Sequence, residues 1–166
     1  MEIIKHFLQD DGTFPNNENL PLIIYRGAIE IKNGASDIEK VFHDNEWGNS
    51  WRNGIFSYHH YHSTAHEVLG IYQGTVKAQL GGPDGITAEL EAGDVVLIPA
   101  GVAHKNLGSS TDFACVGAYP PGQDYAMNYG KIGERPSADK NIRKVPIPNN
   151  DPVEGKQGPL VKEWKK

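Results

Sequence analysis

Apolar residues recur in short runs between Trp51 and Tyr119, and this pattern predicts β-strands. The runs of Val, Ile, Leu, Tyr and Phe are interrupted by glycine at positions 54, 74, 81, 82, 85, 93, 101 and 108. Short strands with such regular punctuation are typical of a sandwich or a barrel. Residues 80–86 are expected to connect a hairpin, and Gly93 to form a tight turn before the next strand. We therefore predict an all-β fold.

The first 50 residues predict one strand and one short helix. The apolar run over 20–26 is expected to be an edge strand, since its proline lacks the N–H that an interior strand would use. Ser36 and Glu39 have the spacing of a capping box. The residues that follow place an apolar stripe on one helical face, and the helix is expected to end near Asn45.

Residues 120–166 are rich in Pro, Gly and Asn and predict an extended C-terminal arm. Tyr119, Tyr125, Tyr129, Leu160 and Trp164 give this arm apolar anchors. We expect three segments: an N-terminal extension over 1–50, a barrel core over 51–119, and an arm over 120–166 that packs on the barrel or on a partner.

Composition and charge argue against several classes of function. The chain has 166 residues, with 16 basic and 21 acidic side chains and a net charge of -5. No basic stripe is present, so no nucleic-acid partner is expected. No apolar run approaches the ~20 residues that cross a bilayer, and no signal peptide is evident, so a cytoplasmic location is expected. The single cysteine, Cys115, lies in an apolar run and is interpreted as a core residue.

A histidine cluster is the strongest chemical signal in the chain. Four of the seven histidines lie within residues 59–66. Residues two apart on a strand share a face, so His60 and His62 are expected to project together. Phe56 and Tyr58 have the same parity, which makes this an inward, mostly apolar face rather than an idle surface pair. Glu67 opens the next run and supplies a carboxylate.

His104 is the fourth candidate. It follows a Pro99-x-Gly101 turn that fixes where the next strand begins. Imidazole with carboxylate is a ligand set for Fe, Mn, Zn, Ni, Co or Cu rather than for Ca or Mg. The sequence therefore predicts one divalent transition metal as a cofactor.

These residues resemble the cupin superfamily. Gly54-x5-His60-x-His62-x4-Glu67-x6-Gly74 is similar to cupin motif one, and Gly93-x5-Pro99-x-Gly101-x2-His104 to motif two. Gly108 departs from the Asn that usually ends motif two, which bears on the backbone after His104 and not on His104 itself. The stretches 60–70 and 117–122 resemble the YjlB-like group of small bacterial cupins.

The resemblance implies a fold and a ligand set. The fold is a double-stranded β-helix, or jelly-roll, barrel of the RmlC-like kind, with the metal inside near one mouth. The implied metal ligands are His60, His62, Glu67 and His104. His66 is the competitor for Glu67, but strand alternation is expected to point it out of the barrel. Tyr58 is a candidate pocket residue, with plain core packing as the alternative.

Three functions remain open on this basis. The first is a metal-dependent enzyme on a small molecule, by oxygen-dependent oxidation or by Lewis-acid isomerisation or decarboxylation, with Glu67 as a candidate base. The second is a non-catalytic protein that binds a metal or a small ligand. The third is a metal-free enzyme that resembles sugar epimerases. A homodimer is expected, since two-fold dimers are the commonest homo-oligomers.

Overall fold

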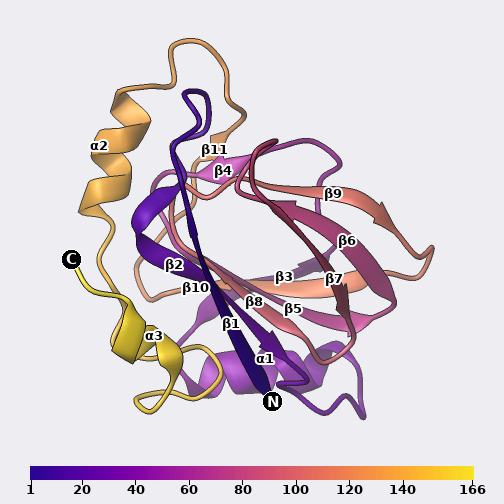
Figure 1. Ribbon diagram of the computed structural model, residues 1–166. Coiled ribbons are helices and arrows are strands. Elements are labelled where there is room, and N and C mark those ends of the chain that lie inside the picture. The colour runs from indigo at the N-terminus through magenta and orange to yellow at the C-terminus, as the bar shows by residue number, and fades with distance from the viewer.

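Two antiparallel sheets face each other and form a jelly-roll barrel, as predicted (Figure 1). The computed structural model describes residues 1–166. The larger sheet has the order β1 (Glu2–Leu8), β2 (Asn17–Arg26), β8 (Val95–Ile98), β5 (Glu67–Gln73), β10 (Ala114–Tyr119) and β3 (Gly48–Asn53). The smaller sheet consists of β7 (Ile86–Glu91), β6 (Thr75–Leu80) and β9 (His104–Ser109). A short pair, β11 (Met127–Asn128) with β4 (Tyr61–His62), lies at one end.

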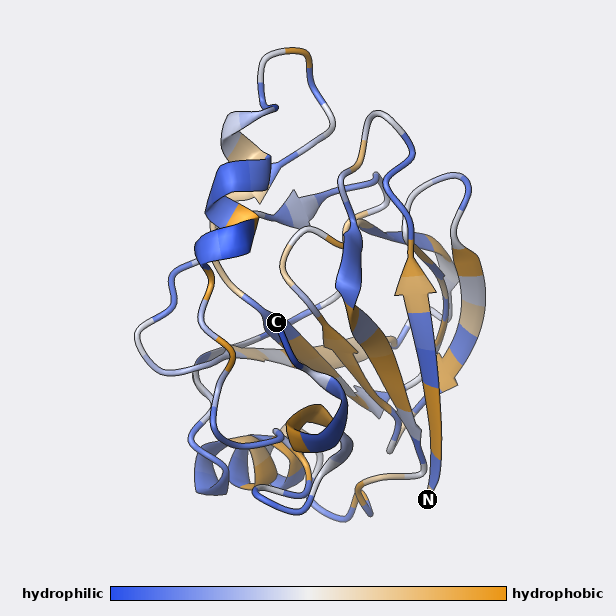
Figure 2. Ribbon diagram, turned by 60° about the vertical axis from the view of Figure 1, so that its left-hand side comes forward, coloured by the Kyte–Doolittle hydropathy of each residue, from blue (hydrophilic) through white to orange (hydrophobic).

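Strand alternation divides the apolar residues between two cores. On β8, Val96 and Ile98 point between the two sheets, whereas Val95 and Leu97 point to the outer face of the larger sheet. The outer face is covered by helix α1 (Ala35–Asp44) and by the end of the chain. The central strands of the larger sheet are accordingly coloured mainly as apolar in Figure 2, whereas the strand at the N-terminus alternates between polar and apolar. The central strands of the large sheet, β2, β8, β5 and β10, are thus buried on both faces.

The strand over 20–26 is not an edge strand, and this expectation was wrong. β1 pairs with one side of β2 and β8 with the other. Leu22 and Ile23 are both fully buried, as befits an interior strand that is covered on both faces. The strand missed was β1, whose outward side chains Ile3 and Phe7 stay 40% and 49% exposed, so its sequence shows no alternation of polar and apolar positions.

Helix α1 forms where it was predicted and is followed by Asn45, but the capping box was wrong. The Ser36 side chain makes no cap to the helix amides. The Asp37 carboxylate instead accepts hydrogen bonds from the amides of Lys32 and Asn33, at 2.7 and 2.6 Å. Glu39 turns away to hold Arg52.

The C-terminal segment contains two helices that composition did not predict, α2 (Ser137–Lys144) and α3 (Pro159–Glu163). Leu160 and Trp164 are buried in the outer core, and the Trp164 indole donates a hydrogen bond to the Pro21 carbonyl at 2.8 Å. Asp151 is fully buried and accepts from the Tyr25 hydroxyl at 2.6 Å. The arm therefore packs on the barrel of its own chain.

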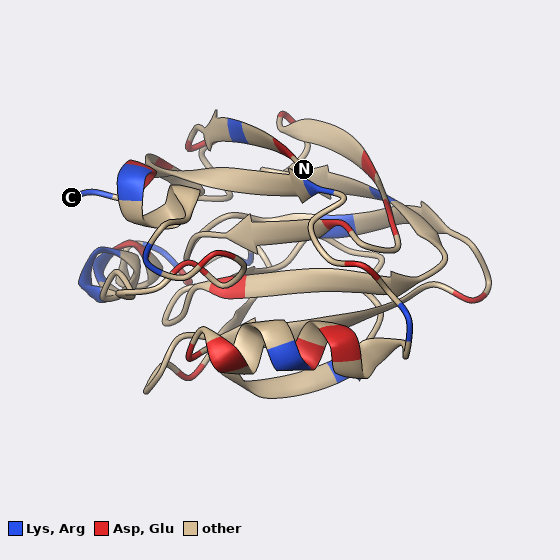
Figure 3. Ribbon diagram, turned by 90° about the horizontal axis from the view of Figure 1, so that it is seen from below, with Lys and Arg blue, Asp and Glu red and all other residues tan.

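Charge is spread over the molecule without a dominant patch. Figure 3 shows lysines and arginines interspersed with acidic residues, and α1 carries both signs. No helix has the length and apolar character that crossing a bilayer would require.

Candidate metal centre

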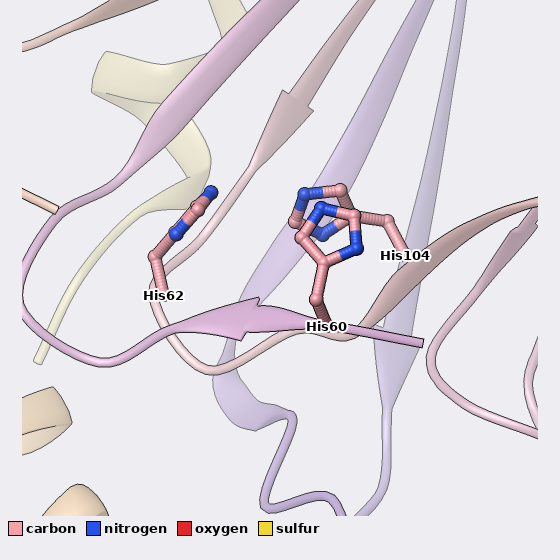
Figure 4. A group of neighbouring side chains, drawn as sticks. All are labelled: His60, His62 and His104. Carbon is pink, nitrogen blue, oxygen red and sulfur yellow. The ribbon is translucent and has the colours of Figure 1, made fainter. Parts of the chain in front are cut away.

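The three predicted histidines converge because two strand ends are tied together by their backbones. His60 and His104 form an isolated β-bridge, in which each amide donates to the carbonyl of the other residue, at 3.2 and 2.9 Å. His62 lies two residues further along, in β4. Each of the three histidines offers a ring nitrogen within 4.8 Å of the others, and all three are buried. Figure 4 shows the rings turned toward one common space.

The turn before His104 fixes this arrangement. The Val102 amide donates to the Pro99 carbonyl at 3.1 Å, and the Gly101 amide donates to the His62 carbonyl at 2.8 Å. Gly101 has a φ of 96°, and a Cβ there would meet the Asn16 carbonyl oxygen. Glycine is needed because only it combines this backbone conformation with such a close approach.

Backbone carbonyls set the protonation of all three rings. In each ring Nδ1 lies near a main-chain carbonyl oxygen, which can only accept, so Nδ1 must carry the proton. In the neutral ring Nε2 then keeps its lone pair, which is the form that binds a metal. The pairs are His60 with Tyr58 at 3.1 Å, His62 with Ala126 at 3.3 Å, and His104 with Val102 at 3.1 Å.

Glu67 faces the same space, as strand alternation predicted. It opens β5 on the side of Leu69 and Ile71, which point between the sheets. Its Oε1 atom lies 3.3 Å from Nε2 of His62 and 3.3 Å from Nε2 of His104. The carboxylate is 2% exposed. A buried carboxylate beside several lone pairs is repulsive unless a proton or a metal cation stands between them, and four convergent donor atoms fit a bound metal ion.

The electrostatics of the site keep Glu67 ionised. Burial by itself would raise the pKa of Glu67, but His62 and His104, when their Nε2 atoms carry a proton in place of a metal, hold that pKa below its usual range by charge and hydrogen bonding. Burial opposes the charge of His62, yet the Glu67 carboxylate raises the pKa of His62 above its ordinary value. Burial, aided by the nearby His104, lowers the pKa of His60 to about 3. His60 is therefore neutral and able to coordinate at any physiological pH.

A cavity of about 570 Å³ opens beside the histidines. His60, His62 and Glu67 line one part of it, and β3 lines another with Asn49, Ser50 and Asn53. The remaining walls are mainly aromatic or apolar: Trp51, Ile55, Phe56, Leu69, Tyr119, Tyr125, Met127 and Tyr129. A small molecule in this cavity would thus reach the imidazoles and the carboxylate directly.

Comparison with known proteins shows the family to which this chain belongs. The family model for the cupin domain matches residues 52–116. The chain is 44% identical over 165 residues to YjlB of Bacillus subtilis (strain 168), an uncharacterised protein, and the match covers 99% of this chain and 98% of YjlB. This chain is a cupin of the YjlB-like group.

Solved structures that resemble this cupin include two enzymes. An acireductone dioxygenase from Bacillus anthracis with a cadmium ion in its active centre matches with a TM-score of 0.43 and 20% identity. The match covers 57% of this cupin and 63% of the dioxygenase, which is less than two thirds of the latter. The epimerase RmlC from Legionella pneumophila Philadelphia 1, in complex with dTDP-4-keto-L-rhamnose, matches with a TM-score of 0.41 and 15% identity over 75% of this cupin and 74% of RmlC.

His66 lies outside the cluster in this cupin. It points to the outer face of the large sheet, where its ring centroid lies 4.6 Å from that of Trp164. Its Nδ1 accepts a hydrogen bond from the Ala100 amide at 2.8 Å. Burial lowers the pKa of His66 to about 3, with a smaller effect of the Lys166 charge. His66 is thus a neutral core residue that helps to fix the turn before His104.

Tyr58 does not line the cavity, which corrects the expectation for its side chain. The ring is 44% exposed and stacks on Phe56, with centroids 5.0 Å apart. Tyr58 contributes to the site its backbone carbonyl, which accepts from His60, and an edge contact of its ring with that of His60, with centroids 5.8 Å apart. The residues before His60 are not in a strand, so parity does not extend back to position 58.

Two side chains that sequence reasoning did not assign to the site touch Glu67 directly or through one neighbour. The Tyr119 hydroxyl donates to Oε2 of Glu67 at 2.8 Å, and the Trp51 indole donates to the Tyr119 oxygen at 2.8 Å. Trp51 packs against the core between the sheets, whereas Trp47 lies in the outer core. Tyr119 is 52 residues from Glu67 along the chain, and no local pattern signals their contact.

Proposed function

We propose that this cupin is a metal-dependent enzyme that acts on a small molecule in the cavity beside His60 and His62. The metal ligands in this proposal are His60, His62, Glu67 and His104. One observation carries it: three imidazoles have Nδ1 committed to backbone carbonyls, so their free Nε2 atoms and a buried carboxylate share one space at a cavity wall. A purely structural site would be closed by its protein ligands, whereas an enzyme needs access from the cavity.

A divalent transition metal held there would supply Lewis acidity to a bound oxygen atom, and, if it is redox-active, a route to oxidation by molecular oxygen. The protein itself positions the substrate and excludes water. The barrel core walls off the buried side of the site, and the aromatic residues of the cavity limit bulk water on the other. Glu67 stays ionised and so offsets part of the charge of the cation.

The lining of the cavity supports a substrate that is uncharged or carries a single negative charge. Arg52 is the one cationic side chain among the lining residues, and the Glu39 carboxylate already holds it through two hydrogen bonds, at 2.9 and 2.7 Å. A diphosphate would find no free cation here, which disfavours a nucleotide-sugar substrate. The aromatic walls favour an apolar or planar body that carries one or two oxygen atoms, such as an enol, a diketone or a hydroxy acid.

The test is metal analysis joined to turnover. The protein is purified without a nickel affinity step, its metal content is measured by mass spectrometry, and the apoprotein is reloaded with Fe, Mn, Co, Ni, Cu or Zn. We expect about one metal per chain, and turnover of an enol, diketone or hydroxy acid that chelation abolishes and one metal restores. His62→Ala should lose the metal. His59→Ala is the control and should keep it, because the His59 ring packs on Phe14.

Three results would contradict the proposal. If the wild-type protein takes up no metal in any form, the site is not a metal centre. If every loaded form binds metal but turns over no substrate, the protein is a metal or ligand carrier. Activity that survives complete chelation would instead support a metal-free enzyme with a histidine base.

A further inference from the structure

Tyr119 occupies a place that determines how Glu67 presents its two oxygen atoms. Oε2 of Glu67 accepts the Tyr119 hydroxyl at 2.8 Å, and Oε1 lies 3.3 Å from Nε2 of both His62 and His104. One oxygen is thus held on the side of β10 while the other faces the histidines.

The direction of these hydrogen bonds follows from chemistry alone. The indole N–H of Trp51 can only donate, so at 2.8 Å the Tyr119 oxygen must accept from it. Tyr119 has a single hydroxyl proton, and its other polar neighbour is the Glu67 carboxylate, which accepts. The chain Trp51–Tyr119–Glu67 therefore runs in one direction and cannot reverse.

The backbone is built to admit Trp51 at this position. Trp51 on β3 pairs with Gly117 on β10, and a Cβ on Gly117 would collide with the indole ring. Without a side chain at 117 the indole lies across β10 and reaches the hydroxyl of Tyr119, two residues further along the same strand. Tyr119 itself is 2% exposed, and its ring stacks on Tyr125 with centroids 5.1 Å apart.

We propose that Tyr119 is a positioning residue, which holds Oε2 of Glu67 so that the carboxylate binds the metal through Oε1 alone. This inference rests on the proposed metal site. Because both oxygens of Glu67 are then engaged, the carboxylate acts as a fixed ligand and is not free to take a proton from a substrate. A partner that orients a metal ligand typically contributes 10- to 100-fold to metal affinity.

The experiment compares Tyr119→Phe with the wild-type protein and with Tyr72→Phe. Tyr72 lies on β5, the strand of Glu67, but packs against the outer core, so the control removes the same hydroxyl away from the site. Co²⁺ is the probe: its affinity is measured by competition with a chromophoric chelator, and its visible absorption reports the coordination number. We expect Tyr119→Phe to bind Co²⁺ about 10- to 100-fold more weakly and with an altered spectrum, as Glu67 rotates to offer both oxygens. Tyr72→Phe should match the wild type in both.

Trp51→Phe is a second variant that tests the same proposal if Tyr119→Phe does not fold. It leaves the Tyr119 hydroxyl in place but removes the donor that orients it, so we expect a smaller shift of affinity and spectrum in the same direction. Unchanged affinity and spectrum in either folded variant would overturn the role of Tyr119 while leaving the metal site intact. A wild-type protein that does not bind Co²⁺ would overturn the metal site, and the role of Tyr119 with it.

Discussion

Acidification should weaken metal binding less steeply than three ordinary histidines would. A ligand imidazole binds a metal only when neutral, so protons compete with the ion at each ring. With an ordinary pKa of about 6.5, each histidine would weaken binding about 25-fold between pH 7 and pH 5, and three would weaken it by roughly 10⁴-fold. A loss of affinity that differs from this roughly 10⁴-fold value shows how the protein shifts the pKa of each imidazole.

His60 and His62 deviate in opposite directions. Burial and the neighbouring His104 lower the pKa of His60 to about 3, so this ring remains neutral throughout the range and adds nothing to the loss. Burial resists protonation of His62, but the Glu67 carboxylate raises its pKa above the ordinary value, so competition at His62 begins at a higher pH. With two rings rather than three in competition with protons, we therefore expect the dissociation constant to rise by roughly 10³-fold between pH 7 and pH 5.

The assay is a competition titration with Co²⁺ at half-unit steps from pH 7.5 to pH 5, at constant ionic strength. The logarithm of the dissociation constant, plotted against pH, should have a slope no steeper than two at its acid end. A slope of three would mean that His60 protonates with the others, which would refute the argument from its burial. A flat line would mean that imidazoles do not bind the ion at all.

Three substitutions test other parts of the structure. Glu67→Gln should weaken metal affinity at least about 100-fold by competition titration, yet leave the thermal stability of the apoprotein unchanged, since the new amide can donate to Nε2 of His62; undiminished affinity would remove Glu67 from the ligand set. Trp164→Ala should lower the free energy of unfolding by about 3–5 kcal/mol in urea, because it empties a buried site and loses a hydrogen bond; a loss below about 1 kcal/mol would mean that the arm is not anchored there. Gly122→Ala is the control, because its backbone is left-handed but a Cβ there meets open space, and it should lower the free energy of unfolding by about 1–2 kcal/mol. Gly101→Ala should lower it by more, because a Cβ there also meets the Asn16 carbonyl. Equal losses would show that the turn has room for a side chain.

The inward facing of the candidate ligands could be predicted because it depends on strand alternation, which is local. His60 and His62 share a face two residues apart, and Glu67 rather than His66 faces inward because β5 continues as a regular strand. The same rule failed at Tyr58, where the chain is irregular and parity has no meaning. Periodicity is thus informative only inside a continuous strand.

The parts that the sequence did not predict depend on contacts between distant segments. Tyr119 meets Glu67 only because β10 lies beside β5, and the Ala126 carbonyl reaches His62 only because β11 pairs with β4. The helices of the arm were hidden by its proline and glycine content. α3 in fact begins at a proline, where a missing N–H costs nothing, and it is secured by the burial of Leu160.

The main-chain acceptors behind the three histidines bear on how this site can evolve. A side chain that orients a ligand can be lost or exchanged in one mutational step, but a peptide carbonyl is present whatever residue occupies its position. The tautomers of His60, His62 and His104 are therefore fixed by main-chain groups and do not depend on which side chains stand at the acceptor positions. Substitutions among the cavity walls, or at Glu67 and Tyr119, can change the preferred metal or substrate while the three imidazoles keep their readiness to coordinate.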